Sequence, residues 1–352
     1  MLKPLQIGPY KLKSNVLLAP MAGITDRPYR DICRSFGAGL VSSEMIASDV
    51  NLWHSKKSAT RLISKDEAEP RCAQIVGTDP YIMAEAAKRC VDLGVQILDI
   101  NMGCPAKKVC KKAAGSALMQ HPDRVKDILH SVVSAVDIPI TLKTRTGWEE
   151  KNKNVLEIAK IAEQSGVSAL YIHGRTRAQK YTGFAEYETI RQVKEKTSLP
   201  IIINGDIKTA KDAKFVLDYS GADAILLGRI TNGRPWIFDT ISHYLKTGDL
   251  KEELSYFNKA NIAIAHIQNI FKYYSHTAEV KTLHQRNNST QSCRTAQKNL
   301  NWYFHSMRLQ PSKKTKKNLF LLHTPEEQLD MFIQLLSELA PNSQKPASQK
   351  QR

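Results

Sequence analysis

The sequence lacks a long apolar segment at its start. Its first 20 residues include Lys3, Lys11 and Lys13, where a secretory signal or a membrane-spanning helix needs unbroken apolar side chains. We therefore expect a cytoplasmic protein that does not enter a membrane.

Cysteine is scarce and unpatterned, with six residues in 352 and no C-x-x-C pair. A chain of this length buries enough apolar surface to fold without disulfides, so we expect reduced thiols. No metal site is expected either, because the ten histidines show no H-E-x-x-H spacing. The G-x-G-x-x-G motif is also missing, since "GAGLVS" at 37–42 has only two glycines, so any nicotinamide has to bind without a Rossmann site.

Acidic residues are few relative to basic ones. The chain has 51 Lys and Arg against 34 Asp and Glu, a formal charge of +17, and the region after residue 250 is the more basic part. A solvated surface rich in lysine would account for some of this excess. Its size favours a polyanionic partner such as a nucleic acid.

What the sequence does contain is a series of eight short apolar runs, most of them separated by segments with helical periodicity. The runs begin at residues 15, 39, 71, 96, 138, 168, 199 and 223. Apolar strands that alternate with helices indicate a parallel sheet covered on both faces, and eight such units predict an α/β fold, the (β/α)8 TIM barrel. A doubly wound open sheet is the alternative. Polar residues gather at the C-terminal ends of the runs, which share one mouth in a barrel, and this favours the barrel.

After the last run the pattern changes to helices without strands. One helix is expected at 257–275 and another at 324–340, where Thr324 and Glu327 have the spacing of a capping box. The stretch between these helices is basic and loop-rich. The expected parts of the chain are a catalytic barrel at 1–245, a smaller all-helical domain at 250–340 and a disordered polar tail at 341–352.

Two loops of the predicted barrel have the composition of a phosphate site. The seventh run ends in "NGD" at 204–206, and the eighth ends in Gly228 and Arg229. Loops at these places in a barrel often bind phosphate through glycine amides and an arginine, so a phosphorylated cofactor or substrate is expected. Lys143, which ends the fifth run, either stabilises negative charge on a bound ring or forms an ion pair with a neighbouring carboxylate.

Cys104 stands where an apolar strand turns into a loop, between Gly103 and Pro105. A buried structural thiol is the common role of a cysteine, whereas a thiol on a turn at the barrel mouth can donate a proton. With an ordinary pKa of about 8.5, such a thiol is mostly protonated near neutral pH. Cys110, six residues further on, is expected to be structural.

Six segments of the sequence, in this order and spacing, resemble the bacterial tRNA-dihydrouridine synthases, most closely their B subgroup. The segments are "LAPMAGITDRPYR", "INMGCPAKKV", "LKTRTGW", "YIHGRTRAQKYTG", "NGDI" and "GRPWIF", and the resemblance spans residues 5 to 245. It implies a flavin-dependent oxidoreductase, an FMN-containing barrel that uses NADPH to reduce the C5=C6 bond of specific uridines in the tRNA D-loop. It also implies a helical domain that helps to hold the tRNA, and we expect a monomer.

The resemblance further implies roles for individual residues. Hydride would pass from the flavin to C6 of uracil, and Cys104 would be the acid that protonates C5 from the other side. Gln74 would meet the pyrimidine edge of the flavin, and Lys143 its N1–C2 region. The residues implied to bind FMN are Pro20, Met21, Ala22, Gln74, Lys143, His173, Asn204, Gly205, Asp206, Gly228 and Arg229. The residues implied to bind the RNA substrate are Asn101, Arg145, Arg175, Arg294 and Lys298.

The sequence departs from that family in the helical domain. The subgroup usually has Ala-Arg-Lys-His shortly before a Trp-Tyr pair, whereas this chain reads "AQKNLNWY", with Gln297 and Asn299 in place of basic residues. The segment 276–292 also lacks the usual glycine-centred pattern. These changes bear on the grip on tRNA and leave the barrel motifs intact. Two other functions stay open: a catalytically inactive RNA-binding relative, and another flavin-dependent barrel such as a dihydroorotate dehydrogenase.

Overall fold

The computed structural model describes residues 3–279 and 285–341, and the chain divides into two compact units. One unit comprises Met1–Ile230 and Trp236–Leu250, and the other comprises Thr231–Pro235 and Lys251–Arg352. Apart from its first residue, the tail predicted at 341–352 lies outside the described residues. No helix in the described part of the chain is long and apolar enough to cross a membrane.

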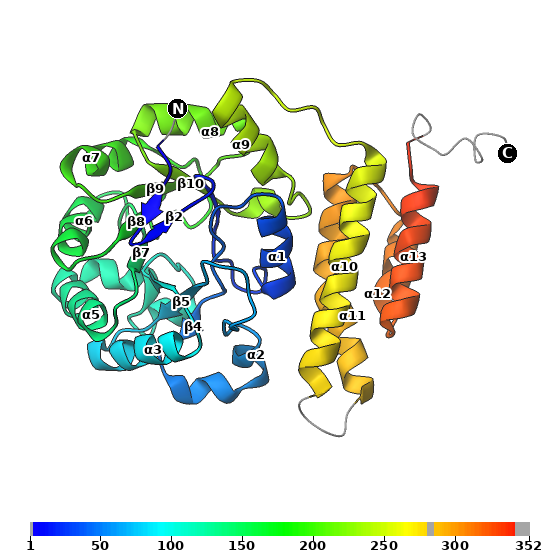
Figure 1. Ribbon diagram of the computed structural model, residues 1–352, viewed down its shortest axis with the longest axis horizontal. Coiled ribbons are helices and arrows are strands. Elements are labelled where there is room, and N and C mark those ends of the chain that lie inside the picture. The colour runs from blue at the N-terminus through cyan, green and yellow to red at the C-terminus, as the bar shows by residue number, and fades with distance from the viewer. Residues whose placement is uncertain (1–2, 280–284, 342–352) are drawn as a thin grey trace. The chain divides into compact units, whose positions relative to one another are not determined.

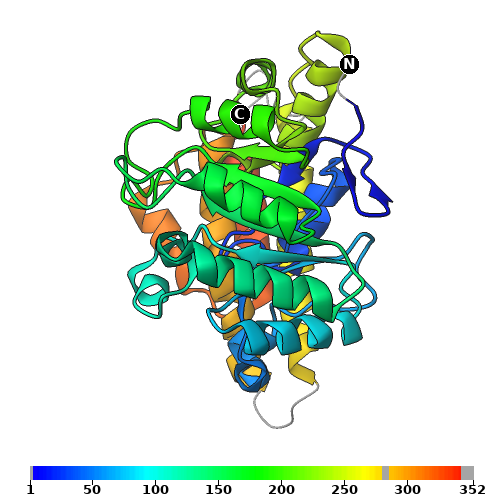
Figure 2. The ribbon, with the colours of Figure 1, turned by 90° about the vertical axis from the view of Figure 1, so that its left-hand side faces the viewer.

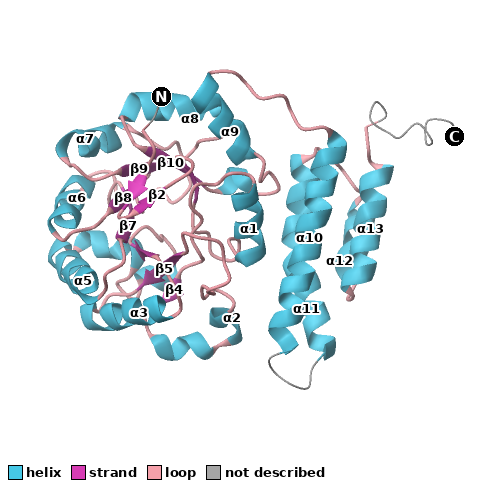
Figure 3. Ribbon diagram, in the orientation of Figure 1, coloured by secondary structure: helices cyan, strands magenta, loops and turns pink. Residues whose placement is uncertain are grey.

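The first unit is a barrel of eight parallel strands surrounded by helices (Figure 1, Figure 3). The strands are β3 (Val16–Leu18), β4 (Ile46–Ala47), β5 (Cys72–Val76), β6 (Ile97–Asn101), β7 (Ile140–Arg145), β8 (Ala169–His173), β9 (Ile201–Asn204) and β10 (Ala224–Leu227). They are hydrogen-bonded in the order β3-β10-β9-β8-β7-β6-β5-β4. The bridges Leu18–Val41 and Ser42–Cys72 join the two ends of this sheet. The predicted TIM barrel is confirmed, and the open doubly wound sheet is excluded.

Helices cover the outside of the barrel, and Figure 2 shows several of them lying side by side over the strands. They are α1 (Arg27–Ser35), α2 (Lys56–Ala59), α3 (Pro80–Asp92), α4 (Lys107–Cys110), α5 (Pro122–Ala135), α6 (Val155–Gln164), α7 (Glu188–Lys196), α8 (Ala210–Ser220) and α9 (Ile237–Thr247), with the 3-10 turns η1 (Val50–His54), η2 (Gly115–Gln120) and η3 (Arg229–Thr231). Asp79 caps the N-terminus of α3 by accepting from the N–H of Ile82. Gly94 and Gly166, with φ of 89° and 82°, follow α3 and α6 and suit the left-handed backbone at a helix C-terminus.

The second predicted strand, which begins at residue 39, is interrupted. Val41 and Ser42 form only isolated bridges, and the regular strand β4 starts four residues later. Between them lies the buried carboxylate of Glu44, which pairs with Arg61 at 2.9 Å. Burial of a carboxylate is costly without a partner, so the backbone leaves the strand to bring Glu44 to Arg61. The prediction of one continuous strand is therefore wrong here.

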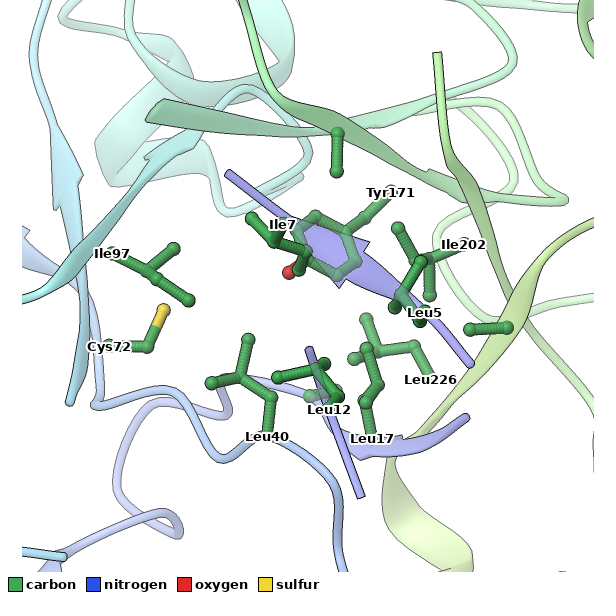
Figure 4. Packing of buried hydrophobic residues seen from close by; sticks show 13 residues of the cluster. Leu5, Ile7, Leu12, Leu17, Leu40, Cys72, Ile97, Tyr171, Ile202 and Leu226 are labelled. Carbon is green, nitrogen blue, oxygen red and sulfur yellow. The ribbon is translucent and has the colours of Figure 1, made fainter. Parts of the chain in front are cut away.

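The N-terminal end of the barrel is closed by a hairpin that the sequence analysis missed. β1 (Gln6–Ile7) and β2 (Tyr10–Lys11) pair antiparallel around Gly8, whose φ of 55° suits glycine. Figure 4 shows the side chains of Leu5, Ile7 and Leu12 packed among residues of the barrel strands. The labelled neighbours are Leu17, Leu40, Cys72, Ile97, Tyr171, Ile202 and Leu226. This apolar plug leaves the C-terminal end of the barrel as the open one.

The described part of the second unit consists of helices. They are α10 (Tyr256–Glu279), α11 (Gln285–Ser306), α12 (Lys313–Leu321) and α13 (Pro325–Glu338). The loop-rich stretch predicted between α10 and α13 is wrong, because most of it forms α11 and α12. The signal was a sparse apolar stripe, with Cys293, Ala296, Leu300 and Phe304 buried at helical spacing within a polar sequence. Phe304 packs edge to face against Phe332 of α13, with ring centroids 5.5 Å apart.

The predicted cap of the last helix is confirmed in part. The hydroxyl oxygen of Thr324 accepts a hydrogen bond from the N–H of Glu327 at 3.3 Å. The same hydroxyl donates to the Glu327 carboxylate at 2.7 Å, where a full capping box has the glutamate accept from the backbone of the cap residue.

Candidate active site

A cavity of about 1090 Å³ opens at the C-terminal ends of the barrel strands. Residues that follow β3, β6, β8, β9 and β10 line its wall, together with side chains of β5 and β7. The lining includes every site residue that the sequence analysis placed in the barrel. These residues are Pro20, Met21, Ala22, Gln74, Asn101, Cys104, Lys143, Arg145, His173, Arg175, Asn204, Gly205, Asp206, Gly228 and Arg229.

Cys104 lies on the turn that follows β6, with its side chain half-buried in the cavity wall. The turn is held from both sides. Asn101 Oδ1 accepts from the N–H groups of Gly103 and Cys104 at 3.3 and 3.0 Å, and the Ser116 hydroxyl donates to the carbonyl of Cys104 at 2.8 Å. Burial raises the pKa of the Cys104 thiol. The thiol therefore faces the cavity with its proton attached at neutral pH.

Cys110 braces the same turn from the protein side. Its Sγ lies 3.6 Å from the carbonyl oxygen of Cys104 and 3.6 Å from the Ser116 hydroxyl. None of the six cysteines forms a disulfide. This position is compatible with the structural role expected for Cys110.

A buried carboxylate that the sequence analysis missed lies beneath the cavity. Asp99, in the middle of β6, accepts from Gln74 Nε2 at 2.6 Å and from Thr141 Oγ1 at 2.7 Å. Gln74 Oε1 in turn accepts from Asn101 Nδ2 at 2.8 Å. Burial raises the pKa of Asp99, while the two hydrogen bonds and Lys143 oppose the shift. The sequence feature that could have indicated this site is an aspartate inside an otherwise apolar strand.

Lys143, in the C-terminal half of β7, forms neither a hydrogen bond nor an ion pair with any described residue. Its register partner on β6 is Asn101, so its ammonium group lies beside the Cys104 turn. Burial and the nearby Arg145 lower the pKa of Lys143, and Asp99 opposes the change. The ion pair considered as an alternative for Lys143 is not formed in the described structure. This cation is available to a ligand.

Another part of the cavity wall is formed by the loops after β9 and β10. The guanidinium of Arg229 lies over the ring of Tyr181, with 4.6 Å to the centroid, and no described carboxylate pairs with it. A Cβ added at Gly228 would meet no atom closer than Met21 Sδ at 3.8 Å, so no side chain crowds this position. An arginine without a carboxylate at an uncrowded glycine suits an anion such as a phosphate.

Arg145 and Arg175 have a different environment from the one expected of RNA contacts. Each is 2% exposed. Arg145 donates to the carbonyl of Gly103 at 2.8 Å and to two carbonyls of the 176–183 loop. Arg175 donates to two further carbonyls of that loop and to Asp206 at 2.6 Å. Their donors are used within the protein, where they position the loops around the cavity.

Asp206 likewise serves the protein. Its carboxylate accepts from Arg175 and from the N–H of Ala185 at 2.8 Å, so it joins the loop after β8 to the loop after β9. Gly205 next to it has a φ of 123°, and an added Cβ would lie 2.7 Å from the Cβ of Ala185. Only glycine fits at this position.

His173 presents a neutral imidazole to the cavity. Burial and the surrounding cations lower its pKa well below the ordinary value. Its Nε2 lies 3.4 Å from Arg175 Nη1, and because a guanidinium only donates, Nε2 accepts and the proton is on Nδ1. Among the described residues, no three His, Cys, Asp or Glu side chains cluster in a way that could hold a metal ion.

The two RNA-binding residues expected in the helical region lie on α11, where Arg294 is exposed and Lys298 is partly buried. The two residues that depart from the family pattern serve packing within the same unit. Gln297 donates to the carbonyl of Phe320 at 2.8 Å, and Asn299 is buried. Of the altered segment 276–292, residues 280–284 lie outside the described structure.

The chain is similar to known proteins over most of its length. The sequence profile described as "Dihydrouridine synthase (Dus)" matches residues 17–340. The "tRNA-dihydrouridine synthase B" of Pseudomonas aeruginosa is 50% identical over 302 residues, which cover 86% of this chain and 87% of that protein. Proteins of the same name from Vibrio parahaemolyticus and Salmonella typhimurium are 52% and 46% identical. These matches cover 77% and 93% of this chain, and 84% and 97% of those proteins.

Solved structures share the barrel at much lower identity. The histamine dehydrogenase from Rhizobium sp. 4-9 aligns with a TM-score of 0.52 at 12% identity, over 70% of this chain and 48% of that chain. This likeness shows the fold alone. The family profile and the relatives go further, because they match the barrel and the helical region together, and the chain belongs to the dihydrouridine synthase (Dus) family.

Proposed function

We propose that this protein is a tRNA-dihydrouridine synthase that reduces the C5=C6 bond of specific uridines in the tRNA D-loop, with FMN as bound cofactor and NADPH as reductant. One observation supports this above the others. The cavity at the barrel mouth combines a protonated thiol at Cys104, a cation without a partner at Lys143 and a phosphate-binding end at Arg229.

The residues present fit FMN. A volume of about 1090 Å³ is sufficient for a flavin and a pyrimidine together, since ligand cavities commonly measure about 300–1,000 Å³. Arg229 would hold the phosphate, next to Gly228, where no side chain crowds the cavity. Asn204 donates its amide hydrogen to the carbonyl of Leu226, which leaves its side-chain oxygen for a hydroxyl of the ribityl chain. When bound, FMN would supply the electron pair for the reduction, which it receives from NADPH.

The remaining FMN contacts would surround the ring system. Pro20, Met21 and Ala22 come from the loop after β3 and offer apolar surface. Gln74 and Lys143 would contact the pyrimidine edge of the flavin. The neutral imidazole of His173 would pack beside the ring. Asp206 would not contact FMN directly, because its carboxylate already binds Arg175 and Ala185. It would act on the cofactor site by fixing the loop next to the phosphate.

Cys104 supplies the proton of the reaction. Its Sγ–H bond breaks, the proton goes to C5 of the uracil, and the thiolate then takes a proton from water. Burial favours the neutral thiol, which is the form that a general acid needs. Lys143 stabilises negative charge that develops on the reacting rings.

Substrate binding divides between the two parts of the chain. In the barrel at 1–245, Asn101 lies next to Cys104 and would contact the uracil. Arg145 and Arg175 would act indirectly, through the loop that they hold. In the helical domain at 250–340, Arg294 and Lys298 would contact the tRNA backbone. We further propose that the enzyme acts as a monomer in the cytoplasm, where tRNA is found.

The two alternatives receive no support from a specific observation. An inactive RNA-binding relative has no need for a cysteine held at a cavity by three hydrogen bonds. A dihydroorotate dehydrogenase is disfavoured by the 46–52% identity to tRNA-dihydrouridine synthases.

The proposal is tested by mapping dihydrouridine in tRNA. Cells with and without the protein are compared, and the purified holoenzyme is then incubated with NADPH and tRNA from the deficient cells. We expect at least one D-loop position to lose dihydrouridine in the deficient cells and to regain it in vitro. Unchanged modification in cells, together with no NADPH consumption in vitro, would refute the proposal.

A further inference from the structure

An unbroken chain of hydrogen bonds leads from a buried carboxylate to the backbone of Cys104. Asp99 accepts from the amide of Gln74 at 2.6 Å, and Gln74 accepts from the amide of Asn101 at 2.8 Å. Asn101 accepts from the N–H of Cys104 at 3.0 Å. The side chains meet because Gln74 on β5 and Asp99 on β6 are register partners in the parallel sheet.

The direction of this chain is determined at both ends. The Asp99 carboxylate accepts in both of its hydrogen bonds, and a backbone N–H only donates. Gln74 therefore turns its NH2 group to Asp99 and its oxygen to Asn101, and Asn101 then turns its oxygen to the Cys104 turn. If either amide rotated end for end, two donors or two acceptors would face each other. Asp99 is thus the acceptor in which the chain ends, and its carboxylate favours the observed orientation of both amides.

The place of Asp99 is costly for stability, which makes a purely structural role a poor explanation. The side chain is 1% exposed within the barrel interior. The ionisable groups that interact with it are Lys143 of β7, Tyr171 of β8 and Cys72 of β5, and of these only Lys143 carries a compensating charge at neutral pH. A well-packed apolar residue at a buried ionic position often leaves a protein equally or more stable.

We propose that Asp99 is a positioning residue for the proton donor: its carboxylate fixes the orientation of Gln74 and Asn101, and Asn101 thereby holds the turn that aims the Cys104 thiol into the cavity. The inference rests on the proposed function. Asp99 does not line the cavity, so it acts only through its neighbours. Displacement of a reacting group by about 1 Å can slow a reaction by as much as 10²-fold, so a loosened turn has a measurable effect.

The test is Asp99→Asn, which keeps the shape of the side chain but can offer a donor to Gln74. The holoenzyme is first reduced with NADPH and then mixed with tRNA, while flavin absorbance is followed. We expect reduction by NADPH at the wild-type rate and reoxidation by tRNA slowed about 10- to 100-fold. The solvent deuterium isotope effect on reoxidation should rise, because transfer of the thiol proton becomes more limiting. A loss of stability alone would move neither the isotope effect nor the ratio of the two rates.

A matched control and a cofactor-free measurement accompany this variant. Thr141→Val removes the other hydrogen bond to Asp99 and leaves the amide chain intact, so its reoxidation rate should stay within about 3-fold of wild type. In FMN-free protein, the alkylation rate of Cys104 by iodoacetamide, read by peptide mass, should change in Asp99→Asn and not in Thr141→Val. If Asp99→Asn does not fold, Gln74→Met cuts the chain at its next bond. Because Gln74 also lines the flavin site, this variant is read only in FMN-free protein, where the alkylation rate of Cys104 should change.

The outcomes separate this inference from the proposed function. Absence of dihydrouridine formation by the wild-type enzyme overturns the proposed function and this inference with it. Wild-type activity together with a wild-type reoxidation rate and isotope effect in Asp99→Asn overturns the inference alone. Where only Gln74→Met folds, an unchanged alkylation rate of Cys104 in the FMN-free variant overturns it. Equal slowing in Asp99→Asn and Thr141→Val also overturns it, because the effect would then follow from the loss of any bond to Asp99.

Discussion

Arg175 Nη2 lies 2.6 Å from Asp206 Oδ2, and this ion pair joins the loops that follow β8 and β9 at the rim of the cavity. The Arg175 side chain is 3% exposed and that of Asp206 is 19% exposed. Because Arg175 also donates to the carbonyl of Gly183, one guanidinium sets the course of the loop that carries Tyr181. Sequence comparison alone suggested an RNA contact for this arginine.

Arg175→Ala should therefore lower stability as well as activity. Removal of one partner of a buried pair leaves an uncompensated charge and typically costs about 3 kcal/mol, which urea denaturation followed by circular dichroism will measure. Lys214→Ala is the matched control, because its pair with Asp218 is exposed and contributes less than about 1 kcal/mol. Equal free energies of unfolding for the two variants would contradict the positioning role of Arg175.

Lys143 should determine how activity declines at alkaline pH. Its pKa is lowered by burial, whereas the pKa of Cys104 is raised, so Lys143 loses its charge first as the pH rises. We expect the rate of flavin reoxidation by tRNA to fall with a midpoint below the ordinary lysine value of about 10.4. In Lys143→Arg, which stays charged, the fall should move to higher pH. If the rate falls at the same alkaline pH in Lys143→Arg as in wild type, Lys143 is not the group that titrates.

His266 should make the helical unit sensitive to acid. Its imidazole is buried with Nδ1 2.9 Å from the hydroxyl of Tyr303, and burial lowers its pKa to about 3. Since the unfolded chain binds the proton near pH 6.5, this neutral histidine contributes stability above that pH, and the contribution is lost as the pH falls. Between pH 7 and pH 5 the loss is about 2 kcal/mol.

The measurement compares the free energy of unfolding of wild type and His266→Gln at pH 7 and pH 5, so that other titrating groups cancel. Glutamine keeps a polar partner for Tyr303 and has no charge to gain. We expect the variant to lose about 2 kcal/mol less than wild type over this range. A pH dependence shared by both proteins would assign the acid sensitivity to other groups.

Binding of tRNA should weaken steeply with salt. A protein of charge +17 that neutralises phosphates releases counterions, and with roughly five to eight contacts the affinity falls by orders of magnitude between low and moderate salt. Filter binding at several NaCl concentrations gives the slope. Arg294→Gln should reduce the slope by about one unit if this exposed arginine of α11 contacts a phosphate. Affinity that is flat across the salt range would remove the electrostatic argument.

Most of the barrel could be predicted from the sequence, because its strands are short continuous apolar runs with polar residues where they end. The exceptions have physical causes. The second strand breaks where the buried Glu44 needs Arg61, and such a tertiary demand leaves no mark in a local pattern. Helix α11 was missed because its buried positions, such as Cys293 and Ala296, are diluted by polar residues with poor helix propensity.

The site shows the same division. It could be predicted that these side chains line one cavity, because parallel strands bring their C-terminal ends to one mouth. Their roles could not, since the sequence does not say whether a side chain reaches the cavity or is already bound. Arg145 donates to carbonyls of neighbouring loops, and Asp99 lies one layer below the cavity behind Gln74.

Cys104→Ala separates a proton donor from a structural thiol. As a donor, Cys104 has no part in binding FMN, so the variant should fold, hold FMN and accept electrons from NADPH at a near-normal rate. General acid catalysis typically supplies about 10²- to 10⁴-fold, and flavin reoxidation by tRNA should slow by that order in stopped-flow absorbance. A structural thiol would instead leave a small cavity, lower stability and reduce activity in proportion to the folded fraction.

Cys110→Ala is the control for Cys104→Ala, because Cys110 braces the same turn and does not line the cavity. Its half-reactions should match those of wild type, so a slow second half-reaction in both variants would point to the turn and away from the thiol proton. If Cys104→Ala is reoxidised by tRNA at the wild-type rate, the proton reaches C5 from another group. The burial that keeps the Cys104 thiol protonated would then serve the stability of the turn that follows β6.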